Sequence, residues 1–174
     1  MIEMELVGVR VEMPSSAPLA ILRERYGDAR VLPIFIGGTE ATAIAFALEE
    51  VETPRPMTHD LMRDLLEELG VSLERVTVTE IRDGVFYAEL LLHGPDGTHT
   101  LSSRPSDALA IAARVGCPIY ASDEVLAEAG FIEVEEDEDE DDAQLGAADE
   151  VPTEEVVEQF RDFIEHVSPE DFAN

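Results

Sequence analysis

The sequence predicts an α+β fold that contains a duplicated unit of three strands and one helix. The first observation is the order of the predicted elements, β-β-β-α-α and then β-β-β-α-β-α. The second is an internal match at an offset of 67 residues, which aligns two alanine-rich helices and the inward-facing positions of three strands. The aligned pairs include Val9 with Val76, Val11 with Val78, Ile34 with Leu101, Ala41 with Ala108, and Ile44 with Ile111. We therefore expect mixed or antiparallel sheets, with the two small-residue helices packed close together.

The first unit begins with three predicted strands, over residues 5–12, 18–24 and 30–38. In the first strand valine occupies every second position from 7 to 11, which is the period of a strand with one buried face. The third strand is apolar along its length, which indicates burial on both faces. The alanine-rich segment 39–49 then predicts a helix.

A second helix is predicted over residues 57–70. Thr58 is the expected N-cap residue, and Gly70 is expected at the position just after the helix, where glycine is favoured. Leu61, Leu65 and Leu69 recur at the spacing of one helical face, so they form its apolar stripe.

The second unit repeats the pattern of the first. Two of its strands are joined by an Arg-Asp-Gly turn, which is a hairpin signal. The predicted strands cover residues 72–81, 85–94, 98–103 and 117–121, and the predicted helices cover 106–116 and 123–130.

Beyond these units the composition changes sharply. Residues 1–131 are expected to form one domain, and residues 132–152 a disordered acidic linker, because like charges at that density resist collapse. Residues 153–174 are expected to form a short amphipathic helix, over residues 153–167, followed by a tail. Its apolar face consists of Val156, Val157, Phe160, Phe163, Ile164 and Val167. This helix could cover the domain or bind a protein partner, and the sequence leaves both open.

The charge balance limits the possible partners. The chain has 40 acidic and 11 basic residues and a net charge of −29, and every basic residue is arginine. Such a field repels nucleic acid, so activity on it would need a local basic patch or bridging cations. The single Cys117 excludes an internal disulfide and a cysteine-cluster metal site. No segment resembles a signal peptide or a membrane span, so we expect a cytoplasmic protein that binds no membrane.

The Thr-His-Asp segment at 58–60 is the first candidate site. His59 could act as a general base or metal ligand, and Asp60 could hold a divalent cation. In the structural alternative, Thr58 caps the helix and Asp60 complements its dipole. At the 67-residue offset, residues 58–60 correspond to Val125, Leu126 and Ala127 of the second unit. The duplicated scaffold therefore does not itself require a His-Asp pair.

Arg55 is the second candidate, because a proline on each side holds the chain extended around it. Its guanidinium could bind phosphate or carboxylate, or simply be exposed on a connector.

The Ser-Arg-Pro-Ser-Asp segment at 103–107 is the third candidate, and Glu40 lies at the position equivalent to Asp107. Both acids suit the first turn of a helix, and Arg104 could form a structural ion pair with either of them. In the functional alternative, Glu40, Asp60 and Asp107 hold Mg²⁺ or Mn²⁺ while Arg55 and Arg104 neutralise a phosphate.

Four stretches resemble a known family, the bifunctional nuclease domain. They read "LPIFIGGTEATAIAFALE", "PRPMTHDLMRDLLEELG", "VFYAELLL" and "SSRPSDALAIAARVGCPIYASDEVLAEAG", and the resemblance covers roughly residues 2–131 with order and spacing kept. The resemblance implies a compact α+β domain with nuclease activity on DNA and RNA. It also implies a homo-oligomer, and we expect a dimer. The helix at 153–167 does not resemble the helix-hairpin motif that some family members carry.

Together with this resemblance, the candidates predict a nuclease that depends on Mg²⁺ or Mn²⁺. The expected catalytic residues are His59, Asp60 and Asp107, the expected substrate-binding residues Arg55, Arg104 and Ser106, and the expected metal ligands Glu40, Asp60 and Asp107. The alternative is a non-enzymatic regulatory or scaffold oligomer that uses its acidic tail and the helix at 153–167 to bind a protein partner.

Overall fold

The computed structural model describes residues 1–132, so the predictions for the acidic linker beyond residue 132 and for the helix at 153–167 lie outside the described residues. Within residues 1–132 the α+β class is confirmed. The elements are β1 (Ile2–Glu12), β2 (Ala17–Glu24), β3 (Arg30–Phe35), α1 (Gly38–Leu48), α2 (Thr58–Glu68), β4 (Ser72–Arg82), β5 (Val85–Gly94), β6 (Gly97–Ser103), α3 (Pro105–Val115), β7 (Ile119–Ala121), α4 (Asp123–Ala129) and β8 (Phe131–Ile132).

The strands form one mixed sheet in the order β6-β5-β4-β7-β1-β2-β3-β8. Neighbouring strands are antiparallel except β4 and β7, which are parallel. The short strand β7 joins the two halves, since Ile119 pairs with Met4 on one side and with Val76 on the other. Each half has three antiparallel strands followed by a helix, while the 67-residue duplication itself stays a prediction.

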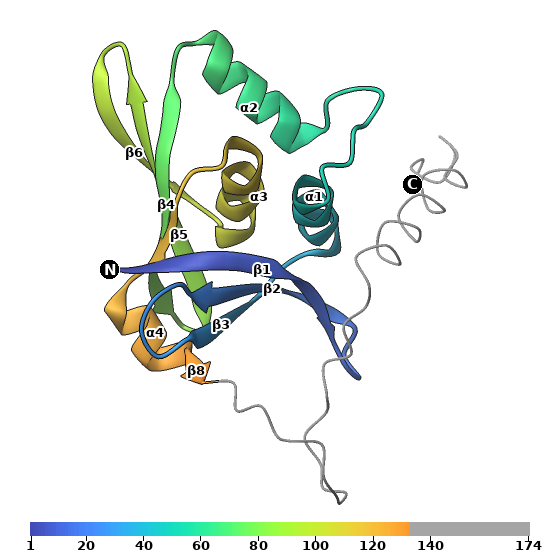
Figure 1. Cartoon of the computed structure of the whole chain (residues 1–174), viewed down its shortest axis with the longest axis vertical. Helices are drawn as coiled ribbons and strands as arrows, with labels where there is room; N and C mark the ends of the chain where they lie inside the picture. The colour runs from blue at the N-terminus through green and yellow to red at the C-terminus, as the bar shows by residue number, and fades with distance from the viewer. Residues whose placement is uncertain (133–174) are drawn as a thin grey trace, which may run out of the picture.

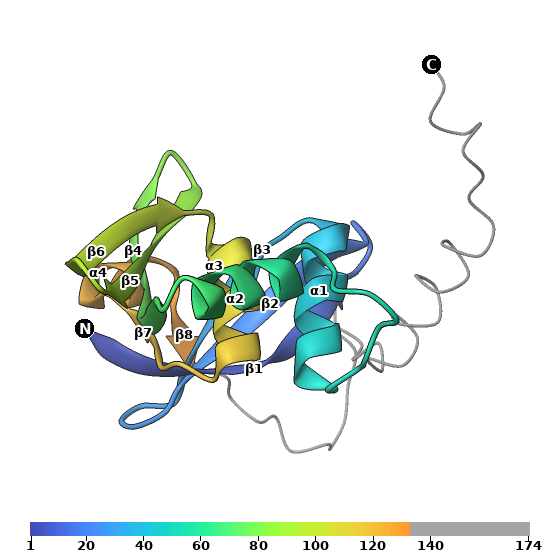
Figure 2. The same cartoon turned by 90° about the horizontal axis from the view of Figure 1, so that it is seen from above.

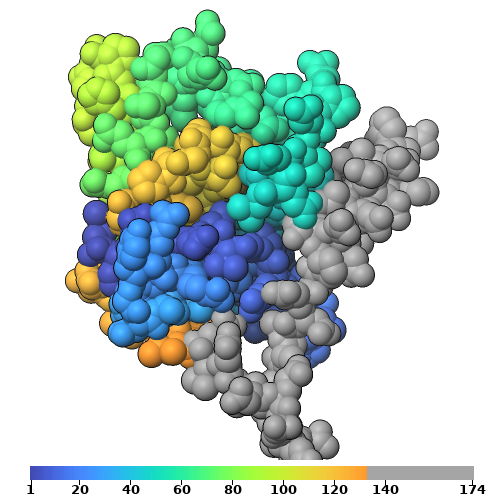
Figure 3. Space-filling view, in the orientation of Figure 1, coloured from blue at the N-terminus to red at the C-terminus, as the bar shows by residue number. Residues whose placement is uncertain are grey.

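Three helices cover the sheet on one side, and α4 packs separately against β3 and β4 (Figures 1 and 2). The central helix is α3, which contacts both α1 and α2. It also fills the middle of the face in Figure 3, between the green and cyan segments and the blue strands. The close packing of α1 and α3 follows from their alanine-rich faces. The largest fully buried side chains include Leu22, Leu32, Ile34, Ile44, Leu109 and Leu126.

The expected burial of β3 on both faces is confirmed at Val31 and Leu32 but not at Phe35, which lies on the same face as Val31 and is 59% exposed. Leu32 and Ile34 belong to the main core, and Val31 packs with Leu19 and Ile21 in a second cluster. Two-sided burial accounts for the apolar residues in the first part of the strand.

The start of α2 differs from the prediction by one residue. Its N-cap is Met57 rather than Thr58, and the carboxylate of Asp60 accepts a hydrogen bond from the Met57 backbone N–H at 2.9 Å. An acid at the third helical position can satisfy the helix start in this way, which makes a hydroxyl at the cap unnecessary. Gly70 follows the helix with φ of 65°, as predicted.

The leucine stripe of α2 faces outward. Leu61, Leu65 and Leu69 are 52%, 51% and 65% exposed, whereas His59 and Leu66 lie on the side that packs against the domain. The helical period in the sequence is therefore real, but it does not mark the buried face. Among residues 1–132 the helices are too short or too polar to cross a membrane.

Candidate active site

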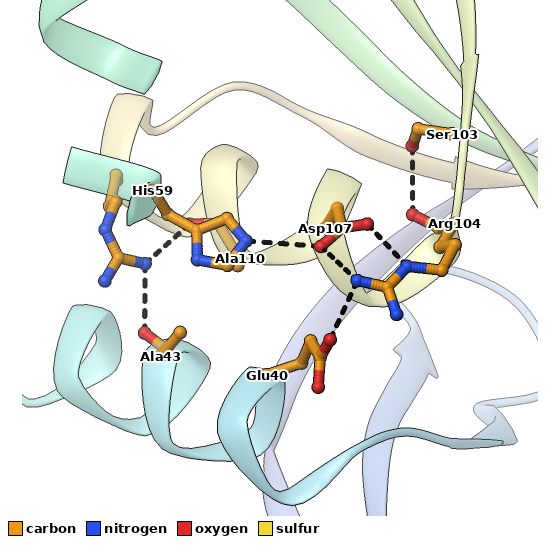
Figure 4. Close-up of polar contacts among 8 residues, drawn as sticks. Glu40, Ala43, His59, Ser103, Arg104, Asp107 and Ala110 are labelled. Carbon is orange, nitrogen blue, oxygen red and sulfur yellow. Dashed lines mark hydrogen bonds and ion pairs between the residues drawn. The ribbon is translucent and has the colours of Figure 1, made fainter. Parts of the chain in front are cut away.

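Three helices begin next to one another, and ionisable side chains from their starts meet there. Glu40 lies in the first turn of α1, His59 in that of α2 and Asp107 in that of α3, and Arg104 is the residue just before α3. Figure 4 shows His59, Asp107 and Arg104 in a row, with Glu40 joined to Arg104 from α1. The helix dipoles favour the two acids at these positions, but they do not account for a buried histidine.

Arg104 bridges the two acids. Its Nε donates to Asp107 Oδ2 at 2.8 Å, and its Nη2 donates to Asp107 Oδ1 at 3.0 Å and to Glu40 Oε1 at 2.8 Å. Both structural ion pairs that the sequence left open are therefore present. These contacts raise the pKa of Arg104, with the larger contribution from Asp107. Gly37 leaves room for the bridge, because a Cβ there would overlap the Glu40 carboxylate.

His59 contacts the same aspartate. Its Nε2 lies 3.3 Å from Asp107 Oδ1, and its side chain is only 8% exposed. Burial acts to raise the pKa of Asp107, but hydrogen bonds from Arg104 and His59 outweigh it, so the pKa lies below its ordinary value. An ionised Asp107 favours the tautomer in which Nε2 carries the proton, and this leaves Nδ1 of His59 as a proton acceptor.

Three polar atoms of this cluster have no hydrogen-bond partner within residues 1–132. They are Nη1 of Arg104, Oε2 of Glu40 and Nδ1 of His59. Every fully buried polar side-chain atom in this part of the chain has a partner, so the Nδ1 of His59 must reach solvent. The cluster thus offers one donor group and two acceptors to a ligand.

A cavity of about 440 Å³ opens beside the cluster, and Glu40, His59, Arg104 and Asp107 all line it. Its remaining walls are mainly apolar and come from α1, α2, α3 and the strands β5 and β6. The apolar lining residues are Ala43, Met57, Met62, Leu90, Leu101 and Ile111. Pockets of this size and composition are typical of small-molecule and cofactor sites.

Asp60 does not join this cluster. It lines a second cavity of about 600 Å³ together with Arg55, Arg63 and Arg114. Arg114 Nε donates to Asp60 Oδ1 at 2.5 Å, and its Nη1 donates to the backbone oxygens of two alanines in α1 and α3. Burial acts to raise the pKa of Asp60, but the hydrogen bonds from Arg114 and from the Met57 N–H outweigh it, so the pKa is lowered.

The predicted site residues therefore divide into three groups. Glu40, His59, Arg104 and Asp107 come together, and Asp60 and Arg55 lie at the second cavity. Ser106 is buried in the first turn of α3 and lines neither cavity.

The arrangement does not fit a divalent cation. Arg104 is already paired with both Glu40 and Asp107, and Asp60 is paired with Arg114 at the other cavity. Among residues 1–132 no three His, Cys, Asp or Glu side chains are grouped so that they could hold a metal ion. A cation would have to displace a guanidinium from its carboxylates before it could bind here.

Sequence reasoning missed Arg114 and the apolar walls of the first cavity. Arg114 is a single arginine in an alanine-rich helix, and its side chain is only 4% exposed. A lone charge on a face of small residues signals a buried partner, although it does not say which one. The cavity walls gave no signal, because their methionines and leucines are indistinguishable in the sequence from core residues.

Comparison with known proteins supports the family resemblance found in the sequence. The family model described as the bifunctional nuclease domain matches residues 20–134. The chain is 46% identical over 170 residues to an uncharacterised protein of Mycobacterium tuberculosis, covering 98% of this chain and 97% of that protein. It is 28% identical over 117 residues to bifunctional nuclease 1 of Oryza sativa subsp. indica, covering 64% of this chain and 35% of the rice protein. It is also 29% identical over 115 residues to bifunctional nuclease 2 of Arabidopsis thaliana, covering 63% of this chain and 35% of that protein. The chain belongs to the bifunctional nuclease domain family.

Proposed function

We propose that this protein is a nuclease that hydrolyses phosphodiester bonds of nucleic acid at the His59–Asp107 cluster. Membership of the family supports the reaction class, and the names of the plant relatives point the same way. The observation that carries the assignment to this site is a buried histidine, oriented by an ionised aspartate, at the wall of a cavity. This pairing is the usual arrangement for a general base.

In the proposed reaction, Nδ1 of His59 takes a proton from the water that attacks phosphorus. The new P–O bond forms as the bond to the leaving oxygen breaks, and His59 returns its proton to that oxygen. Asp107 holds the imidazole through Nε2 and stabilises its cationic form. The free Nη1 of Arg104, whose side chain is 66% exposed, donates to a non-bridging phosphate oxygen.

Dependence on Mg²⁺ or Mn²⁺ is a separate proposal, which derives from the resemblance. No step above passes through a cation, because the carboxylates at the cluster are engaged by Arg104. Cleavage measured with EDTA and with added Mg²⁺ or Mn²⁺ decides this point. The net charge of −29 makes about 0.15 M salt a suitable condition, because repulsion is then screened beyond about 8 Å.

The test is cleavage of labelled single- and double-stranded DNA and RNA by the purified chain and by His59→Gln. Loss of the base is expected to lower the rate about 100-fold or more. His99→Gln serves as the matched control, because His99 is an exposed residue of β6 outside the cavity. This variant should cleave like the wild type.

Equal cleavage by wild type and His59→Gln would rule out this site. If the wild type cleaves no faster than a mock preparation, the nuclease function itself is wrong.

A regulatory or scaffold oligomer is the second candidate, and the exposed stripe on α2 favours it. Leu61, Leu65 and Leu69 form an apolar surface of the kind that marks sites of protein association. We propose a dimer, and a protein partner for the helix at 153–167, under this alternative. Partner sets of the full chain and of residues 1–131, compared by pull-down, test the role of the tail.

A further inference from the structure

The cavity beside the cluster is apolar on its walls and acidic at its edge. Methionine and leucine side chains from α2, β5 and β6 line the walls, and the ionisable cluster forms the edge. Its volume of about 440 Å³ is in the range of pockets that enclose a small organic group. A flat apolar ligand with polar groups on one edge fits this division.

The charge at the edge selects for hydrogen-bond donors. One guanidinium, Arg104, faces two carboxylates, Glu40 and Asp107, so the cluster keeps an excess of negative charge. Oε2 of Glu40, which has no partner among residues 1–132, is an acceptor, and Glu40 is one of the residues that line the cavity. A base edge that meets Glu40 should therefore present N–H rather than a carbonyl oxygen, while Nη1 of Arg104 remains for a phosphate and Nδ1 of His59 for the attacking water.

We propose that this cavity binds one unpaired nucleobase whose amino group donates to the acidic edge. This inference rests on the nuclease function proposed above, and it makes single-stranded nucleic acid the substrate class. Carboxylates read the N4 amino group of cytosine by the same chemistry elsewhere. The N6 amino group of adenine presents an equivalent donor.

The base must be unpaired for two reasons. In a duplex the pairing partner occupies the Watson–Crick edge and leaves only one amino hydrogen, in the major groove, and the faces of the base are covered by its neighbours in the stack. Unstacked bases in single strands expose both, and proteins bind them by apolar contact with the faces and hydrogen bonds to the edge. The exposed guanidinium of Arg104 at the cavity edge then lies where a flanking phosphate can reach it.

The experiment is a binding titration of the full chain with nucleosides, followed by NMR chemical shifts. Two near-isosteric pairs are used, cytidine with uridine and adenosine with inosine, because in each pair an amino group is replaced by a carbonyl oxygen. The amino-bearing member is expected to bind about tenfold more tightly, which is the usual effect of one hydrogen bond to a charged group. Equal affinities within both pairs would overturn the proposal.

The variant Leu101→Ser tests whether cytidine binds in this cavity. Leu101 lies on the cavity wall but is 55% exposed, so its loss should weaken cytidine binding several-fold while the domain stays folded. Val85→Ser is the matched control, since Val85 is 56% exposed on β5 and lies outside the cavity. Wild-type affinity in Leu101→Ser would place the base elsewhere and overturn the proposal.

Nucleoside binding and strand cleavage can fail separately. If cytidine binds as described and no strand is cleaved, the base site stands and the nuclease function falls. If strands are cleaved and cytidine does not bind, the nuclease function stands and the base site falls.

Discussion

His59 and Asp60 are neighbours in the sequence, yet their side chains lie at different cavities and contact different partners. His59 contacts Asp107 at the first cavity, and Asp60 pairs with Arg114 at the second. Successive residues of a helix point about 100° apart, so an adjacent pair at the start of α2 can face two sides of that helix. The structure therefore separates a catalytic candidate from a structural one within a single dipeptide.

Asp60→Asn is expected to destabilise the domain by about 3 kcal/mol, because it leaves the buried guanidinium of Arg114 without its counter-charge. Asp64→Asn is the matched control on the same helix. Its partner Arg63 is 43% exposed, and exposed pairs contribute less than about 1 kcal/mol. Urea denaturation gives both values, and similar losses in the two variants would contradict the structural role of Asp60.

At the residue scale the sequence predicts which side chains matter better than it predicts their partners. The predicted positions of Glu40 and Asp107 at helix starts are confirmed, because the helix dipole acts locally. The bridge through Arg104 joins residues 64 apart, and the sequence offered it as one of two outcomes. The pairing of Asp60 with Arg114 depends on the packing of α2 against α3, which no local pattern encodes.

At the scale of elements, α2 is the helix whose packing is least explained by the domain itself. It buries His59 and leaves Leu61, Met62, Leu65 and Leu69 exposed. Met62 also lines the first cavity, so a protein bound along this helix would adjoin the proposed site. Amphipathic periodicity predicted the helix correctly and could not say which face the domain covers, because an association surface and a core face have the same composition.

Leu61→Gln/Leu65→Gln is expected to leave the free energy of unfolding within about 1 kcal/mol of the wild type, since both side chains are half-exposed. Leu66→Gln, one position further along and packed against the core, is expected to lose about 2 kcal/mol or more. Light scattering over a range of concentrations should show a lower mass for the double variant than for the wild type. An unchanged oligomer mass would place any self-association on another surface.

At the scale of the whole molecule, the sequence predicted the class and order of the elements but not how the two halves meet. Strands within each half pair with sequence neighbours, which alternation and turns make visible. The three residues of β7 join the halves, and a strand that short pairs by tertiary position alone. The close contact of α1 with α3 was predictable, because alanine-rich faces permit it.

The net charge of −29 also belongs to this scale. A strongly acidic surface disfavours extended contact with a nucleic acid, so any substrate contact must be local. A cavity that takes one base, with a single exposed arginine at its edge, meets this requirement better than a long basic groove would.

The most direct test compares Asp107→Asn with Asp60→Asn in single-turnover cleavage of a labelled single strand, at a temperature where both variants are folded. Asparagine at 107 keeps the shape of the side chain but removes the charge that orients His59, so the rate should fall about 100-fold or more. Asparagine at 60 lies outside that cluster, and its rate should stay within a few-fold of the wild type. The opposite result, with activity lost at position 60 and kept at position 107, would contradict the assignment of the site.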